Sequence, residues 1–133
     1  MYKIMALDIG TKRIGVALSD FLLMIASGHS CISRVPEDEA LEKIYEIAKN
    51  NKVEKIIVGI PINMDGSLGF QAENCTKFAD KIKGYEIIKE DERLTSSEAE
   101  ENLKERKIDF RKDKGLVDIE SARLILEQYL ARL

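Results

Sequence analysis

The chain of 133 residues has the length of one domain, and its composition of 44% hydrophobic and 34% charged residues excludes wholesale disorder. Its 24 acidic and 21 basic side chains give a net charge of −3, which argues against a protein that coats nucleic acid through a broad basic surface but permits a local basic patch. We therefore expect a single domain over residues 1–133.

The first part of the chain has the pattern of three antiparallel strands. Residues 3–8 and 13–19 are apolar runs joined by a turn at residues 9–12, which predicts a hairpin. Residues 26–33 are small and polar, as is typical of an edge strand. The sheet is therefore predicted to begin with antiparallel pairing.

The rest of the chain alternates between helical and strand patterns. A helix with acidic residues in its first turn is predicted from Pro36 to about Asn50, and residues 55–60 form an apolar run typical of a buried parallel strand. The remaining predicted elements are a loop (61–69), a helix ended by Gly84, a strand (85–89), a helix capped by Thr95 and Glu98, a charged linker (107–115) and a helix from about Val117. This order predicts an α/β fold, a five-stranded mixed sheet with helices on both faces.

Cysteine and histidine usage excludes a thiolate zinc site. Cys31 and Cys75 lie far apart without the spacing of zinc ligands, and His29 is the one histidine. The N-terminal apolar run reaches Asp8 too early for a signal peptide, and no stretch approaches the roughly 20 apolar residues of a membrane span. We expect a cytoplasmic protein without membrane contact.

Acidic residues fall where α/β sheets form their sites, outside the carboxyl ends of parallel strands. The first strand ends at Asp8, and the fifth runs into Asp91 and Glu92. If these two strands are parallel and adjacent, their acids meet at one edge of the sheet. Asp118 falls in the first turn of the last helix, on the side of Ala122, which should face the sheet.

A cluster of Asp8, Glu92 and Asp118 would repel itself unless a divalent cation neutralised it. Carboxylate ligands suit Mg²⁺ or Mn²⁺, and two such ions can support phosphodiester cleavage without a histidine. We therefore expect these three residues to be catalytic and to bind metal. Asp91 is the alternative to Glu92, because neighbouring side chains of a strand point to opposite faces.

Basic and hydroxyl side chains near the acids are expected to bind the phosphates of a substrate. The candidates are Thr11, Lys12 and Arg13 of the first turn, Arg93 beside the second acid, and Lys104, Arg106, Arg111 and Lys112 of the basic stretch. Each feature also has a purely structural interpretation: Asp8 can begin an Asx turn, Asp118 can be a favourable first-turn acid, and the basic stretch can be a solvated loop.

Four segments carry a resemblance to one family: LDIGTKRIGVALSD, VGIPINMDGSLGFQ, DERLTSSEA and VDIESARLILEQYL. The first and third are specific in combination, whereas the last would be weak alone. In order and spacing the four segments resemble the YqgF (RuvX) family, and the resemblance covers nearly the whole chain. It implies a ribonuclease H-like fold and acidic site positions at Asp8, at Asp91 or Glu92, and at Asp118. The family commonly has two alanines after the last acid, where this chain has Ser121 and Ala122.

The resemblance implies a metal-dependent endonuclease that cleaves structured nucleic acid in the 5′-end maturation of the 16S ribosomal RNA precursor. Two alternatives stay open: a Holliday junction resolvase on branched DNA, for which a homodimer is expected, and a non-catalytic nucleic-acid-binding or ribosome-assembly factor. The first segment also resembles the phosphate-binding hairpin of actin- and hexokinase-type ATPases. Those proteins close two domains over the nucleotide, and this chain has room for one.

Overall fold

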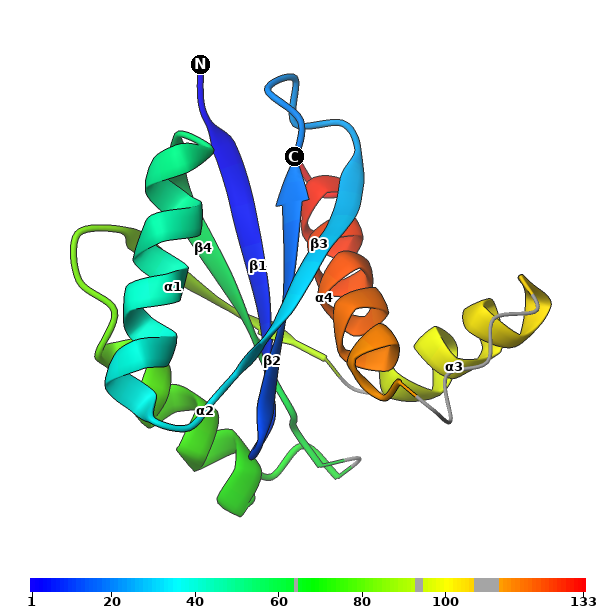
Figure 1. Cartoon of the computed structure of the whole chain (residues 1–133). Helices are drawn as coiled ribbons and strands as arrows, with labels where there is room; N and C mark the ends of the chain where they lie inside the picture. Colours follow the sequence, from blue (N-terminus) through cyan, green and yellow to red (C-terminus); the bar gives the residue numbers. More distant parts are fainter. Residues whose placement is uncertain (64, 93–94, 107–112) are drawn as a thin grey trace.

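The computed structural model in Figure 1 describes residues 1–63, 65–92, 95–106 and 113–133, with the backbone alone at residues 95–98. In chain order the elements are β1 (Lys3–Ile9), β2 (Arg13–Ser19), β3 (Ala26–Ser33), α1 (Glu37–Asn50), β4 (Val53–Ile60), α2 (Phe70–Asp80), β5 (Glu86–Asp91), α3 (Thr95–Glu105) and α4 (Gly115–Leu130). None of the helices described is both long enough and apolar enough to cross a membrane.

The strands form one mixed sheet in the order β3-β2-β1-β4-β5. β1 pairs with β2, and β2 with β3, in antiparallel fashion, whereas β1 with β4 and β4 with β5 are parallel. The predicted fold class is therefore confirmed, including the edge position of residues 26–33. The assumption that the first and fifth strands are adjacent is wrong, because β4 lies between them.

Alternating side chains give the sheet two apolar faces, and each is covered by helices. Met5 and Leu7 of β1 belong to the core under α1 and α2, whereas Ile4 and Ala6 belong to the core under α4. Figure 1 shows α1 and α2 on one side of the sheet and α4 on the other. Because Asp8 continues the series of Ile4 and Ala6, its side chain lies on the α4 face.

The bounds of two elements at the site differ from those predicted. β5 continues to Asp91 rather than ending at Lys89, so that Glu92 directly follows the strand. α4 begins at Gly115, which the sequence had assigned to the linker. Most of that predicted linker, residues 107–112, and the predicted capping side chains of Thr95 and Glu98 lie outside the described part of the chain.

Candidate functional site

Asp8 lies between two glycines of the neighbouring strands. It is aligned with Gly15 of β2, and on β4 the alignment of Leu7 with Val58 puts Gly59 next in line with Asp8. Because a Cβ at either glycine would meet groups that pack on the α4 face, both positions lie on the same face as Asp8. Neither neighbouring strand therefore carries a side chain at the position aligned with Asp8.

Gly59 allows Glu92 to reach Asp8 across the intervening strand. A Cβ at Gly59 would lie 2.6 Å from Glu92 Oε2, so the carboxyl group of Glu92 occupies the space above this glycine. The backbone N–H of Glu92 donates to the carbonyl oxygen of Ile60 at 3.2 Å, which fixes the chain just after β5. The Asp8 and Glu92 carboxyl groups are hydrogen-bonded to each other. The acids of two non-adjacent strands thus meet because β4 has no side chain between them.

Asp91 is directed to the other face of the sheet. It is aligned with Ile60, whose side chain belongs to the core under α1 and α2. Glu90, one residue earlier, is on the α4 face, where Arg132, just after α4, binds it at 2.6 Å. Alternation returns Glu92 to that face. Of the two predicted alternatives, the geometry brings Glu92 to the site.

Gly15 allows the first turn of α4 to approach the sheet. A Cβ at Gly15 would lie 2.0 Å from the carbonyl oxygen of Asp118, so the helix backbone packs directly on the sheet beside Asp8. The carboxylate of Asp118 accepts a hydrogen bond from Arg13 Nε at 2.7 Å. Cys31 Sγ lies 4.0 Å from the same carboxylate oxygen. Asp118 is therefore next to Asp8, and its carboxylate is bonded to Arg13.

Burial makes the pair of Asp8 and Glu92 electrostatically costly. Desolvation and the charge of Asp118 raise the pKa of Asp8 to about 6, although the hydrogen bond from Glu92 opposes this rise. Desolvation, the charge of Asp8 and the hydrogen bond that Glu92 donates to it raise the pKa of Glu92 to about 10. Two carboxyl groups in contact cannot both ionise cheaply, so the pair shares a proton at neutral pH.

These residues fit a hard divalent cation, because their donors are carboxylate oxygens and a cation would replace the shared proton. Ser121, one helical turn after Asp118, adds a hydroxyl that is buried and has no hydrogen-bond partner within the described chain. Among the described residues, no three acidic, cysteine or histidine side chains converge on one cation position. Asp118, the third expected ligand, is instead bonded to Arg13.

We expect the protein to lose stability as the pH rises when divalent cations are absent. The pKa values of Asp8 and Glu92 are raised from 3.8 and 4.5, so from about pH 4 to about pH 10 the folded state binds more protons than the unfolded state. The free energy of unfolding therefore falls with rising pH in this window. Denaturation in EDTA at about pH 5 and about pH 8 should show a fall about 1–3 kcal/mol larger in the wild type than in Glu92→Gln. Equal pH dependence in the two proteins would contradict the shared proton.

Some of the predicted phosphate-binding residues are exposed in the structure, and others lie outside the described part of the chain. Thr11 and Lys12 are exposed in the turn between β1 and β2, where they adjoin Arg13, and Lys104 is exposed near the end of α3. The turn carrying Thr11 and Lys12 lies at the same edge of the sheet as Asp8. Three further candidates, Arg93, Arg111 and Lys112, lie outside the described residues.

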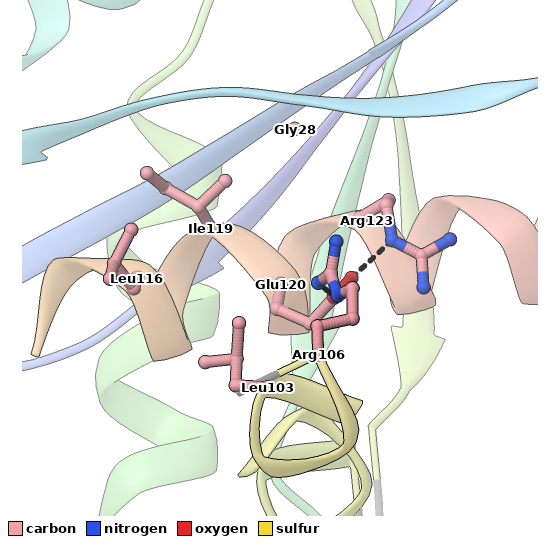
Figure 2. Close-up of a pocket in the computed structure, with 7 residues that line it drawn as sticks. All are labelled: Gly28, Leu103, Arg106, Leu116, Ile119, Glu120 and Arg123. Carbon is pink, nitrogen blue, oxygen red and sulfur yellow. Dashed lines mark hydrogen bonds and ion pairs between the residues drawn. The ribbon is translucent and has the colours of Figure 1, made fainter. Parts of the chain in front are cut away.

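Arg106 is bound within the protein. Its guanidinium forms an ion pair with Glu120, to which Arg123 also binds, and the side chain of Glu120 is only 4% exposed. Figure 2 shows these three side chains beside a pocket of about 190 Å³, whose apolar wall includes Leu103 and Ile119. The negative charge of Glu120 is thus neutralised where α3 packs on α4.

Sequence reasoning missed Arg34, which is buried at the junction of β3 and α1. It donates to the carbonyl oxygen of Gly10 at 2.9 Å and to Asn74 Oδ1 at 3.0 Å, and it stacks 4.9 Å from the ring centroid of Phe78. Arg34 therefore fastens the turn between β1 and β2 to α2. An isolated arginine carries no local signal of this role, whereas a glycine inside a strand, such as Gly15, does indicate close backbone approach.

The sheet order β3-β2-β1-β4-β5, with helices on both faces, is that of a ribonuclease H-like fold. The structure resembles T. thermophilus RuvC in complex with a Holliday junction substrate, with a TM-score of 0.56 and 14% identity over 99% of this chain and 96% of that chain. It also resembles the Fowlpox virus resolvase in complex with Holliday junction DNA, with a TM-score of 0.60 and 12% identity over 98% and 97% of the two chains. At these identities the likeness shows the fold.

The model of the RuvX family, described as Holliday junction resolvase, matches residues 2–132, and the chain belongs to this family. A relative from Endomicrobium trichonymphae is 44% identical over 134 residues, which cover 98% of this chain and 96% of the relative. One from Halothermothrix orenii (strain H 168 / OCM 544 / DSM 9562) is 45% identical over 131 residues, 96% and 94% of the two chains. Both carry the name "Putative pre-16S rRNA nuclease". The resemblance to the YqgF (RuvX) family is confirmed.

Proposed function

We propose that the chain, as one ribonuclease H-like domain over residues 1–133, is a metal-dependent endonuclease that matures the 5′ end of the 16S ribosomal RNA precursor in the cytoplasm. The observation that carries this proposal is the hydrogen-bonded pair of Asp8 and Glu92 above Gly59, with Asp118 beside it. The names of the relatives support the RNA substrate. The family description and the two resolvase structures favour a second candidate, a homodimeric resolvase of branched DNA.

Asp8, Glu92 and Asp118 are the proposed ligands of Mg²⁺ or Mn²⁺, with two ions as the proposed number. When bound, the ions supply a nucleophilic water at neutral pH and neutralise the charge that develops on the leaving oxygen. The residues of the chain position the substrate: Thr11, Lys12 and Arg13 bind phosphates at the edge of the sheet. Gly59 leaves room for the carboxyl group of Glu92 beside Asp8, and Gly15 leaves room for the start of α4, so that the acids gather at one edge of the sheet.

Glu92→Gln is expected to reduce cleavage about 100-fold or more, because it removes one carboxylate from the pair while keeping its shape. Asp91→Asn is the matched control: it removes the same charge from the neighbouring residue, whose side chain is directed to the opposite face. Cleavage in this control should stay within about threefold of the wild type. Single-turnover rates at saturating Mg²⁺ compare the two. A larger loss in Asp91→Asn than in Glu92→Gln would reverse the assignment.

The proposed activity is tested by offering the purified protein two substrates, a 5′-extended 16S precursor RNA and a four-way DNA junction, each with Mg²⁺, with Mn²⁺ or with EDTA. We expect cleavage of the RNA at a defined position near the mature 5′ end when metal is present, and none in EDTA. Symmetric cleavage of the junction, with the RNA left intact, would favour the resolvase and a homodimer. Binding of RNA without cleavage of either substrate would favour a non-catalytic assembly factor.

A further inference from the structure

Arg13 and Asp118 link the phosphate-binding turn to the helix that carries the third acid. The two residues are 105 positions apart in the sequence, and Arg13 Nε donates to Asp118 Oδ2 at 2.7 Å. The side chains are 40% and 21% exposed, so the pair lies at the mouth of the site and is open to solvent on one side. One side chain expected to bind phosphate is therefore bonded to one expected to bind a cation.

The two expected roles compete with the bond that the structure shows. Asp118 Oδ2 accepts a hydrogen bond from the guanidinium, which holds the carboxylate toward Arg13 and competes with a cation for its negative charge. The same guanidinium would bind a backbone phosphate through charge-assisted hydrogen bonds. A phosphate that takes Arg13 therefore frees the carboxylate of Asp118 to bind a cation.

The release of Asp118 needs only a side-chain rotation. Its backbone is packed against the sheet at Gly15, where even a Cβ would lie 2.0 Å from the Asp118 carbonyl oxygen. The helix start is therefore held in place, and a rotation about χ1 would be enough to turn the carboxylate away from Arg13. The charge of Asp118 already raises the pKa of Asp8, so this carboxylate acts electrostatically on Asp8 before it turns.

We propose that Arg13 exchanges between Asp118 and a backbone phosphate of the nucleic acid, so that binding of the nucleic acid completes the cation site. This proposal rests on the proposed function, because it takes Asp118 as a cation ligand and nucleic acid as the substrate. By linkage, each ligand then raises the affinity of the protein for the other by the same factor. Arg13 is a positioning residue here, since it acts on the cation through Asp118.

The experiment measures Mn²⁺ affinity by calorimetry in wild type, Arg13→Gln and the matched control Lys12→Gln, which removes a charge from the same turn and leaves the bond to Asp118 intact. Without nucleic acid, Arg13→Gln should bind Mn²⁺ about 5- to 10-fold more tightly than the wild type, and Lys12→Gln within about twofold of it. A second titration follows the binding of a cleavage-resistant phosphorothioate RNA with and without Mn²⁺. Mn²⁺ should tighten RNA binding more in wild type and in Lys12→Gln than in Arg13→Gln.

The outcomes separate this proposal from the proposed function. Saturable Mn²⁺ binding with equal affinity in Arg13→Gln and Lys12→Gln, and equal tightening of RNA binding, would overturn the exchange and leave the nuclease proposal standing. Absence of saturable Mn²⁺ binding in all three proteins, both without the RNA and with it, would overturn both. Because Arg13 is 40% exposed, its replacement should leave the fold intact, which far-ultraviolet circular dichroism checks.

Discussion

Asp8→Asn is expected to abolish cleavage, by about 1,000-fold or more, while leaving the protein folded and at least as stable as the wild type. Asparagine keeps the shape of the side chain and can donate a hydrogen bond to Glu92, but it cannot serve as an anionic ligand. It also removes the charge that burial and Asp118 make costly, so the free energy of unfolding in EDTA at about pH 8 should rise by about 1 kcal/mol. Cleavage rates and urea denaturation of the two proteins measure both effects.

Asp20→Asn is the matched control for this substitution. Asp20 accepts hydrogen bonds from the backbone N–H groups of Met24 and Ile25 at 2.8 and 3.0 Å, and these bonds lower its pKa. The same chemical change there should leave cleavage unaffected and make the protein less stable, the opposite of the result at Asp8. Cleavage by Asp8→Asn within tenfold of the wild type would remove Asp8 from the proposed catalytic residues.

Gly15→Ala is expected to cost about 2–4 kcal/mol of stability and to weaken cation binding, although it adds only one methyl group. The new Cβ would lie 2.0 Å from the Asp118 carbonyl oxygen and 3.0 Å from the Ile119 backbone nitrogen. Because both atoms belong to the helix backbone, the start of α4 must move away from the sheet, and Asp118 moves with it. Urea denaturation and Mn²⁺ calorimetry measure the two consequences.

Gly28→Ala provides the comparison for this prediction. A Cβ at Gly28 would lie 2.5 Å from Ile119 Cγ2, a side-chain methyl group rather than helix backbone. The expected cost is therefore smaller, about 1–2 kcal/mol, with cation binding unchanged. If the two alanine variants were equally stable, the close approach of the α4 backbone at Gly15 would not be the feature that positions Asp118.

The fold and the acids of the site could be predicted largely from sequence patterns, but the way in which Asp8 and Glu92 meet could not. Alternation and turn residues identified the hairpin that carries Asp8, and the apolar run 55–60 identified an interior strand. Strand order is a tertiary property, however, and the insertion of β4 between β1 and β5 has no local signal. The role of Gly59 follows from that order, because the glycine matters only where Glu92 crosses over it.

The candidate site was likewise predicted only in part: sequence patterns supplied the residues, and the structure shows which of them meet. Alternation left Asp91 and Glu92 as alternatives, and the extension of β5 to Asp91 places Glu92 on the face of Asp8. The basic side chains were predicted by charge alone, and charge does not reveal a partner that is distant in the sequence. Arg13 is bonded to Asp118, and Arg106 is bonded to Glu120. Both ion pairs join different elements, so they depend on packing rather than on spacing.

The most direct test of the central claim is a crystal structure of the protein with Mn²⁺, in which anomalous scattering locates the ion. We predict a peak in contact with the carboxylate oxygens of Asp8 and Glu92, above Gly59, and no such peak in Asp8→Asn. A saturating concentration of Mn²⁺ that leaves Asp8 and Glu92 hydrogen-bonded to each other, with the ion bound elsewhere or not at all, would contradict the assignment of this pair as the metal site of a nuclease.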